Sequence, residues 1–416
     1  MRIRNSVIVG YDIISPLGTD LDVQWHAACR GTSGIGPLTR FPIDAGFPVQ
    51  IAGQVPEFDA SPYPFLKPRE IANWKSPIFK HALLVVHRAL QKSGIEITEK
   101  LAPRVAVTFS SAVGGLDSVL AADRRMQAEN KLPPPFTNPN ACINMVTGKI
   151  AILTGATGPI AATITACATG ATSMIMGEML LAAGRADVAI CGAVDFAIVE
   201  PIVAGFATMN GAYRPKPGKA ELSPQASSRP FSNGRRGFVI SEGAGAVILA
   251  TPEFAAAHGI DARIGIRGWS MTADAHHFVA PHEPTVRRCM LESIADAGIQ
   301  PEDIDAINAH AASTQVGDRV EYDAIYAVFG GQVPPVTANK SMTGHAMGAS
   351  SAIESVFAME GMVKSTIIPT INYEPDAEMP LEQIVVRQQT LEQEFVLKNA
   401  FGFGGCNACI VFQRIG

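Results

Sequence analysis

The chain has 416 residues, of which 47% are hydrophobic and 17% are charged, and its mean hydropathy is +0.17. A chain of this length buries a large core, and the length predicts two or three domain-sized units. The low charge and the 38 glycines favour a compact, enzyme-like body over a disordered or fibrous one, and a net charge of −5 gives no reason to expect nucleic acid or an anionic membrane as a partner.

The first apolar run follows two arginines, as in a secretory signal peptide. Asp12 interrupts this run and no cleavage site of small residues follows, so we expect a first strand. Residues 150–177 carry no charge and are numerous enough to span a bilayer. Gly155, Gly158 and Pro159 interrupt them, so we predict a buried strand, turn and helix and no membrane span.

Apolar, β-branched runs that end in small residues recur along the chain, each followed by helical periodicity. They cover 6–10, 104–110, 161–166, 186–193 and 304–311. Such alternation indicates α/β layers whose strands are buried on both faces. Residues 213–236 are polar and rich in Pro, Ser and Gly, which predicts a surface loop serving as a lid or a connection.

The cysteines give no disulfide framework. They are scattered and odd in number, at positions 29, 142, 167, 191, 289, 406 and 409. This pattern indicates a reducing compartment, and we expect a cytoplasmic protein. The pair in "CNAC" at 406–409 has metal-site spacing, but a zinc site needs four ligands and no second pair accompanies it, so we predict no metal.

A short repeat relates two distant parts of the chain. "CATGATS" at 167–173 is matched by "HAMGASS" at 345–351, with four identical residues, and apolar helical patterns and strand-like runs follow both copies. The repeat predicts two similar α/β halves, each of which turns from a loop into a helix at this point.

The repeat suggests a role for Cys167. A residue at the start of a helix lies near unpaired amides and the positive end of the helix dipole, which lowers the pKa of a thiol and supplies donors to an oxyanion. If a pseudo-twofold axis relates the halves, Cys167 and His345 face each other as nucleophile and base. The alternative on this argument alone is an inert buried cysteine and an unrelated histidine.

Longer motifs carry a resemblance to a known family. They are "TACATGA", "RPFSNGRRGFVISEGAGAVIL", "SMTADAHHFVAPHE", "INAHAASTQVGD", "NKSMTGHAMGASSAIES" and "NAFGFGGCNA". In order and spacing they resemble the β-ketoacyl-[acyl-carrier-protein] synthases of the elongating, type II kind, from "SPLGTD" to the last strand. The resemblance implies a thiolase-like, five-layered αβαβα fold of two duplicated halves, with the nucleophile in residues 1–255 and two catalytic histidines in 256–416.

The resemblance also implies a reaction, a decarboxylative Claisen condensation by an acyltransferase. An acyl group moves from acyl carrier protein to Cys167, and malonyl-carrier protein then loses CO₂ and attacks the thioester. Two neutral imidazoles, those of His310 and His345, would donate to the enolate oxygen. The backbone amides of Cys167 and Phe403 would form an oxyanion hole. Lys340 would orient and tune the histidines, with Glu354 as a supporting carboxylate.

The acyl pocket is also implied by the resemblance. Phe401 and Phe403 would act in a glycine-rich gate, and Val113 would line the deep end of the tunnel, where a medium-sized side chain leaves room for medium-length chains. Phe206 and Thr314 are the other substrate-binding residues that it implies. His277 borders the site or has a surface or core role.

The implied partners are acyl carrier protein and a second ketosynthase-like subunit, in a homodimer or a heterodimer. No cofactor is expected beyond the phosphopantetheine arm of the carrier. Because the carrier is acidic, docking residues should be basic. The candidates are Lys67, Arg69, Lys75 and Lys80, or Arg124 and Arg125.

Three positions depart from the family pattern. Ala311 replaces a glycine, Ala312 replaces a threonine whose hydroxyl contacts the pantetheine arm, and Cys406 replaces a threonine. Losing one such hydrogen bond weakens arm binding by about 0.5–1.5 kcal/mol. The departures favour a specialised pathway, such as polyene or polyketide synthesis, over housekeeping fatty-acid synthesis.

Other readings remain open at this point. A chain-length-factor-like partner subunit would lack the nucleophile, which Cys167 argues against. A thiolase using coenzyme A would need a second catalytic cysteine, for which Cys406 is suitably placed, although His345 with Lys340 fits a synthase better. A non-elongating acyltransferase or cyclase could use Cys167 without decarboxylation.

Overall fold

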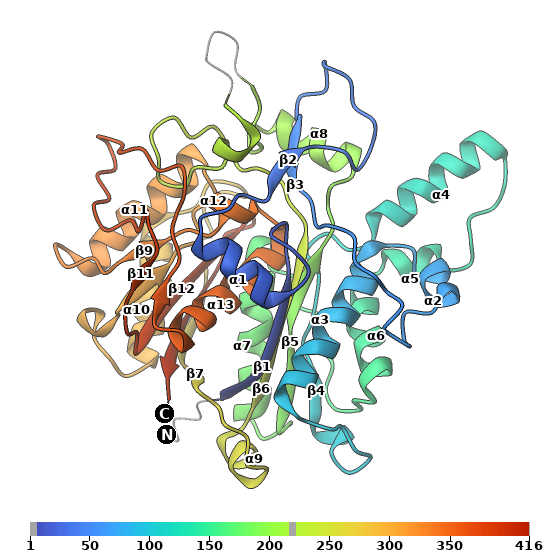
Figure 1. Ribbon diagram of the computed structural model, residues 1–416, viewed down its shortest axis with the longest axis horizontal. Coiled ribbons are helices and arrows are strands. Elements are labelled where there is room, and N and C mark those ends of the chain that lie inside the picture. The colour runs from blue at the N-terminus through green and yellow to red at the C-terminus, as the bar shows by residue number, and fades with distance from the viewer. Residues whose placement is uncertain (1–5, 216–221, 416) are drawn as a thin grey trace.

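The computed structural model describes residues 6–215 and 222–415, and within them the largest sheet has the strand order β4-β5-β6-β1-β7-β13-β12-β8-β9 (Figure 1). Its strands are β1 (Val7–Ile14), β4 (Val105–Val107), β5 (Val188–Asp195), β6 (Gly243–Ala250), β7 (Ile264–Ala273), β8 (Ala306–Asn308), β9 (Val336–Thr337), β12 (Phe395–Gly402) and β13 (Cys406–Arg414). Two small antiparallel pairs are β2 (Ile35–Pro37) with β3 (Ile51–Gly53) and β10 (Thr366–Ile367) with β11 (Gln389–Thr390).

The helices are α1 (Leu21–Cys29), α2 (Pro68–Asn73), α3 (Pro77–Ser93), α4 (Leu116–Glu129), α5 (Thr137–Ala141), α6 (Asn144–Thr154), α7 (Thr169–Ala182), α8 (Glu200–Thr208), α9 (Pro252–Ala257), α10 (Glu283–Asp296), α11 (Gln315–Phe329), α12 (Lys340–Thr343) and α13 (Met347–Val363). In the part of the chain that the structure describes, no helix has the length and apolar character needed to cross a bilayer.

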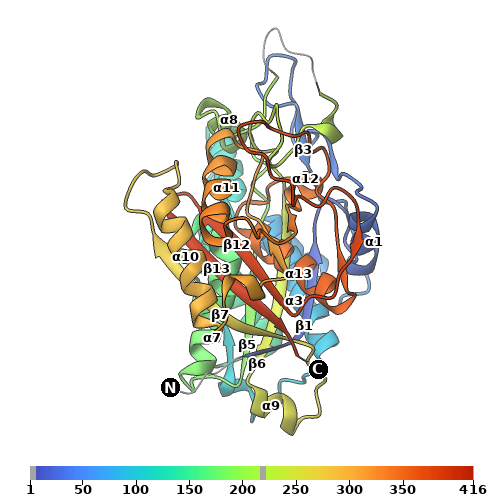
Figure 2. The same cartoon turned by 90° about the vertical axis from the view of Figure 1, so that its left-hand side faces the viewer.

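The long sheet consists of two parts that meet at one short junction. β4, β5, β6 and β1 form one part, and β7, β13, β12, β8 and β9 form the other. The two parts are joined where Val7 pairs with Gly265 and Ile8 with Ile264. α3 packs on the outer face of the first part, α10 packs on the outer face of the second with α11 beside it, and α7 and α13 pack between the two parts (Figures 1 and 2). The result is the layered α/β body that the motifs imply.

The repeated glycines explain how the two central helices approach each other. A Cβ atom on Gly170 of α7 would lie 2.6 Å from the backbone nitrogen of Ala352 in α13. A Cβ on Gly348 of α13 would lie 2.8 Å from Cβ of Thr169 in α7. Any larger residue at either position would force the helices apart. The repeat therefore encodes the close contact that brings the two loop-to-helix turns together.

The predicted strand at 161–166 is wrong. Of this region only Ile160 makes a bridge, to Val107, and it lies beyond β4 at the edge of the sheet. Ile160 and Ile164 are 53% and 50% exposed, so the segment is not buried as expected. A run of small and β-branched residues predicts extended backbone, but a single sequence does not show whether a neighbouring strand covers it.

The loop predicted at 213–236 is only partly on the surface, and its residues 216–221 lie outside the described part of the chain. Residues 227–232 are buried. Phe231 joins the core of the second half with φ +57°, and its N–H donates to Asp318 at 2.8 Å. The side chains that satisfy this backbone come from distant parts of the chain, so local composition predicted exposure wrongly.

Candidate active site

Cys167 lies in a short 3-10 turn, Ala166–Ala168, immediately before α7. Ala166 has φ +48°, a left-handed conformation that is costly for a residue with a Cβ. The turn is held by Thr169, whose hydroxyl donates to the Ala166 carbonyl at 2.7 Å and accepts from the Thr165 N–H at 3.1 Å. This strained turn presents the sulfur at the junction of loop and helix, and the Cys167 residue is 7% exposed.

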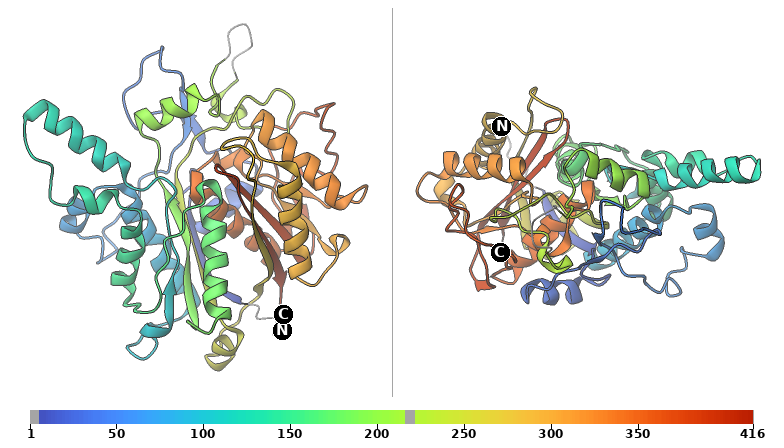
Figure 3. Two further views of the ribbon diagram at one scale, coloured as in Figure 1. Left: turned by 180° about the vertical axis from the view of Figure 1, so that it is seen from behind. Right: turned by 90° about the horizontal axis from the view of Figure 1, so that it is seen from above.

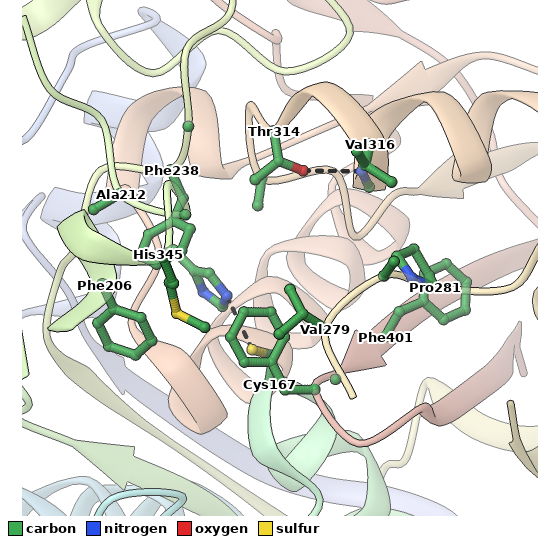
Figure 4. A pocket seen from close by; sticks show the side chains of 18 of the residues that line it. Cys167, Phe206, Ala212, Phe238, Val279, Pro281, Thr314, Val316, His345 and Phe401 are labelled. Atoms are coloured by element: carbon green, nitrogen blue, oxygen red, sulfur yellow. Dashed lines mark hydrogen bonds between the residues drawn. The ribbon is translucent and has the colours of Figure 1, made fainter. Parts of the chain in front are cut away.

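His345 approaches the sulfur from the equivalent turn of the other half. Its Nε2 lies 3.1 Å from Sγ of Cys167, and its Nδ1 lies 2.9 Å from Oγ of Ser350 in α13 (Figure 4). The two turns therefore face each other, as the repeat predicts. The ring also packs edge-on against Phe238, which limits its rotation.

His310 follows β8 and lies beside His345, with their ring centroids 5.8 Å apart. A buried carboxylate fixes its backbone: Glu321 of α11 accepts the His310 N–H at 2.8 Å and the Ala311 N–H at 2.7 Å. Phe401 packs edge-on against the imidazole. His310 therefore lies at the pocket. Among the described residues, its ring makes no hydrogen bond to Cys167.

Lys340 and Glu354 lie behind the histidines. Nζ of Lys340 donates to the His310 carbonyl at 2.5 Å and lies 3.5 Å from Nδ1 of that ring, and its charge acts on both histidines. Oε1 of Glu354 lies 2.6 Å from Nζ of Lys340. The other oxygen, Oε2, lies 2.6 Å from Nζ of Lys398, a residue that sequence analysis missed. The motif spacing gives the loop positions but not which ring the lysine reaches.

The amide of Phe403 points at the same sulfur. The backbone N–H groups of Phe403 and of Cys167 itself both act to lower the pKa of the thiol, which places two donors beside Sγ. Gly402 permits this approach, because a Cβ there would lie 2.4 Å from the Thr165 carbonyl and 3.1 Å from the Cys167 nitrogen. The end of β12 therefore abuts the nucleophile turn.

The ionisation of the site corrects one expectation. Burial raises the pKa of Cys167 to about 11, although Lys340 and the two amides oppose this rise, so the helix start does not by itself produce a thiolate. Burial first, and then the charge of Lys340, hold the pKa of His310 and of His345 well below the usual range. Both imidazoles are neutral at neutral pH, as the implied chemistry requires.

A pocket of about 690 Å³ opens onto these groups, and Cys167, His310 and His345 all line it. Figure 4 shows Phe206, Ala212 and Phe238 on one side of Cys167 and Val279, Pro281 and Phe401 on the other. Among residues that the sequence suggested, Val113, His277, Ala312, Thr314 and Phe403 also line the pocket. The Thr314 hydroxyl is already engaged, because it caps α11 by accepting from the Gly317 N–H at 3.2 Å.

Asp195 is a further buried group that sequence analysis missed. It ends β5 and accepts from the Ser111 hydroxyl at 2.6 Å and from the amides of Ala112, Val113 and Gly348 at 2.9–3.1 Å. It fixes the pocket wall at Val113 to the start of α13. The signal was available, since Asp195 stands at the end of a predicted strand, where site residues of α/β proteins gather.

The predicted docking residues do not line the pocket. Lys67, Arg69 and Lys75 are exposed. Arg124 pairs with Glu200 at 2.8 Å and Arg125 with Glu129 at 3.3 Å, while Lys80 pairs with Glu57. Two other basic residues, the half-buried Arg214 and Arg236, do line it. Both belong to the polar 213–236 segment, which the sequence predicts as a surface loop, so their place in the pocket wall was not expected.

Cys406 and Cys409 both lie on β13, three residues apart, so their side chains point to opposite faces of the sheet. They cannot share a metal ion in this conformation. Within residues 6–215 and 222–415, no group of three or more His, Cys, Asp or Glu side chains is arranged to hold a metal.

Residues 4–255 match the family described as "Beta-ketoacyl synthase, N-terminal domain", and residues 264–374 match the corresponding C-terminal domain. The chain belongs to the β-ketoacyl synthase family. It is therefore a condensing enzyme of the acyltransferase class. A relative from Coxiella burnetii, named 3-oxoacyl-[acyl-carrier-protein] synthase 2, is 35% identical over 100% of both chains. One of the same name from Staphylococcus aureus (strain COL) is 33% identical over 99% of this chain and 98% of its own.

Solved ketosynthase structures share the fold of this β-ketoacyl synthase over its whole length. A β-ketoacyl synthase from Burkholderia phymatum STM815 matches with a TM-score of 0.91 and 25% identity, covering 99% of this chain and 100% of its own. The ishigamide ketosynthase/chain length factor matches with a TM-score of 0.90 and 28% identity over 100% of both chains. A type II polyketide ketosynthase in complex with its acyl-carrier protein, bound to a hexaketide, matches with a TM-score of 0.88 and 26% identity over 100% of both chains. The thiolase-like fold that the motifs imply is confirmed.

Proposed function

We propose that this β-ketoacyl synthase elongates an acyl group held on Cys167 by decarboxylative condensation with malonyl-carrier protein. The observation that carries the proposal is the convergence at one pocket of a thiol, a base 3.1 Å from it, two amide donors and a second neutral imidazole. Plain acyl transfer needs the thiol, the base and the two amide donors. Decarboxylation needs the second imidazole as well.

In the first half-reaction the sulfur of Cys167 attacks the carrier thioester. Its proton moves to Nε2 of His345, and the oxyanion is held by the amides of Cys167 and Phe403. The tetrahedral intermediate collapses to the acyl-enzyme, and the proton passes to the departing pantetheine thiolate. Because the thiol is protonated at neutral pH, this transfer to His345 is part of the reaction and does not precede it.

In the second half-reaction the C–C bond to the malonyl carboxylate breaks, CO₂ leaves, and negative charge develops on the thioester oxygen. Nε2–H of both histidines would donate to that oxygen. The carbanion then attacks the acyl-enzyme, the C–S bond to Cys167 breaks, and the β-ketoacyl chain leaves on the carrier. The sulfur leaves as a thiolate and takes a proton from water, which restores the resting thiol.

The hydroxyl of Ser350 allows His345 to act in both half-reactions. A hydroxyl can donate or accept, so Ser350 can accept from Nδ1–H while Nε2 takes the thiol proton. It can equally donate to Nδ1 while Nε2–H donates to the enolate oxygen. The lysine ammonium beside His310 can only donate, which keeps the proton of that ring on Nε2.

The proposal is tested by mass spectrometry of the protein mixed with acyl- and malonyl-carrier protein. We expect acyl mass on Cys167, followed by CO₂ release and a β-ketoacyl product two carbons longer. Labelling of Cys167 without CO₂ release would favour the acyltransferase or cyclase reading, and no labelling would favour a partner subunit. The starter chain is found in the same experiment by offering carriers with different acyl lengths.

Lys67, Arg69 and Lys75 supply exposed positive charge for carrier docking, and Arg214 and Arg236 supply it at the pocket. We expect the double change Lys67→Glu and Arg69→Glu to raise KM for the acyl carrier roughly 3- to 10-fold, with kcat unchanged, because charges at the edge of an interface act mainly on association. Steady-state kinetics at two salt concentrations would measure this. Lys100→Glu, an exposed lysine that is not among the predicted docking residues, is the matched control.

The exposed edge beyond β4 supports an assembly with a second ketosynthase-like chain. Ile160 and Ile164 lie exposed on it, and α4 projects from the body with Leu116, Val119 and Met126 exposed at 42%, 38% and 43% (Figure 3). Unpaired edges and apolar patches of this kind are normally covered by another chain.

We expect Ile160→Asp with Ile164→Asp to convert a dimer to a monomer, since a buried unpaired carboxylate costs several kcal/mol at an interface. Sedimentation or light scattering would show the halved mass. Val23→Asp on α1, which is 59% exposed, is the control. A monomeric starting protein would mean that this edge needs a different, related subunit.

A further inference from the structure

Lys398 is a lysine in the middle of a buried strand. Its residue is fully buried, and its neighbours on the same face of β12, Val396 and Ala400, belong to the apolar core between the two parts of the sheet.

 Neither Val396 nor Ala400 offers a polar group to an ammonium ion, so an apolar residue would pack at position 398 at lower cost. A buried charge at this position therefore suggests a functional role for Lys398.

The partners of Lys398 connect it to the site. Its Nζ donates to Oε2 of Glu354 at 2.6 Å and to the Asn399 carbonyl at 2.7 Å. Oε1 of the same carboxylate lies 2.6 Å from Nζ of Lys340, which donates to the His310 carbonyl. One carboxylate is therefore shared between two ammonium groups, and the three side chains together carry one net positive charge.

We propose that Lys398 is a positioning residue that takes up half of the Glu354 carboxylate, so that the Lys340 ammonium keeps a positive field on the two histidines and on Cys167. With Glu354 paired to Lys340 alone, the two charges would cancel and this field would vanish. The proposal concerns the same pocket and rests on the proposed function for its use in catalysis, but its test needs no carrier protein.

The electrostatics of the surrounding groups agree with this geometry. Burial is the largest cause of the lowered pKa values of His345 and His310, and the charges of Lys340 and Lys398 lower both values further. The charge of Lys340 also lowers the pKa of Cys167, against the rise that burial causes. The remaining titratable groups that act on Lys398 or on the thiol are Glu321 of α11, Cys409 of β13 and Asp195 of β5. Glu321 also acts on Lys398, and burial raises the pKa of this carboxyl group.

Three variants separate a field effect from a packing effect. Lys398→Met removes the net positive charge of the three groups, Glu354→Gln adds one positive charge, and the double variant restores the original sum. The readout is the midpoint pH for alkylation of Cys167 by iodoacetamide, followed by mass spectrometry, with the thermal midpoint of each variant measured in parallel.

We expect Lys398→Met to raise the alkylation midpoint by on the order of one pH unit, because a nearby positive charge stabilises the thiolate. Glu354→Gln should lower it, and the double variant should return close to the wild-type midpoint although it lacks the whole ion pair with Lys398. A packing role predicts the opposite, with the double variant at least as perturbed as either single one.

An unchanged midpoint in Lys398→Met, or a double variant that does not recover, would overturn the proposal. If Lys398→Met does not fold, Glu354→Gln is compared with Glu354→Gln plus Lys398→Gln, where removal of the lysine charge must again raise the midpoint and a flat result overturns the proposal. Failure of condensation in the wild-type protein would refute the proposed function and leave these alkylation results standing.

Discussion

Cys167→Ala is expected to abolish both half-reactions and to lower condensation by at least about 10⁴-fold, because no acyl-enzyme can form without the sulfur. Intact-protein mass spectrometry should then find no acyl mass after incubation with acyl-carrier protein. The thermal midpoint should stay within a few degrees of wild type, since replacing the thiol of one buried side chain by hydrogen removes little volume.

Cys406→Ala is the matched control for this experiment. Cys406 is a half-buried thiol at the first residue of β13, next to the glycine-rich turn that follows Phe403. The Cys406→Ala variant should still be acylated at Cys167 and should keep its condensation activity. A large loss of activity in Cys406→Ala, with acylation of Cys167 intact, would instead support the thiolase reading, in which a second cysteine takes part.

The parts of the site that sequence predicts are those encoded by local motifs. A seven-residue repeat placed Cys167 and His345 at equivalent turns, and the structure joins their side chains at 3.1 Å. The same turns contain the glycines that let α7 and α13 touch, so one short pattern records both a packing requirement and a pair of chemical groups.

The parts that sequence did not predict depend on contacts between distant segments. The ring that Lys340 reaches is set by the packing of α12 against the loop after β8, and spacing along the chain does not specify it. The sequence around Lys398 does not distinguish it from a solvent-exposed strand residue, whereas the structure shows that β12 is buried on both faces. The raised pKa of Cys167 has the same origin, because helix position is local whereas burial is a property of the whole fold.

The two histidine variants should differ in which half-reaction they lose. His345→Ala removes the base 3.1 Å from the thiol and one enolate donor, so we expect acylation to fall by about 10²–10⁴-fold and condensation to fall further. His310 contacts Lys340 and lies beside His345. Among the described residues, its ring makes no hydrogen bond to the sulfur of Cys167. His310→Ala should therefore acylate at close to the wild-type rate but release CO₂ about 10²–10³-fold more slowly.

Rapid-quench measurement of acyl mass on Cys167, beside CO₂ release from labelled malonyl-carrier protein, separates the two effects. His258→Ala at the end of α9, whose ring stacks on Phe254, should change neither rate. Equal losses of acylation in both active-site variants would mean that the histidines act as one unit in thiol activation. That result would contradict the separate roles proposed for the two rings, since both line the pocket and, among the described residues, it is Nε2 of His345 that lies 3.1 Å from the sulfur.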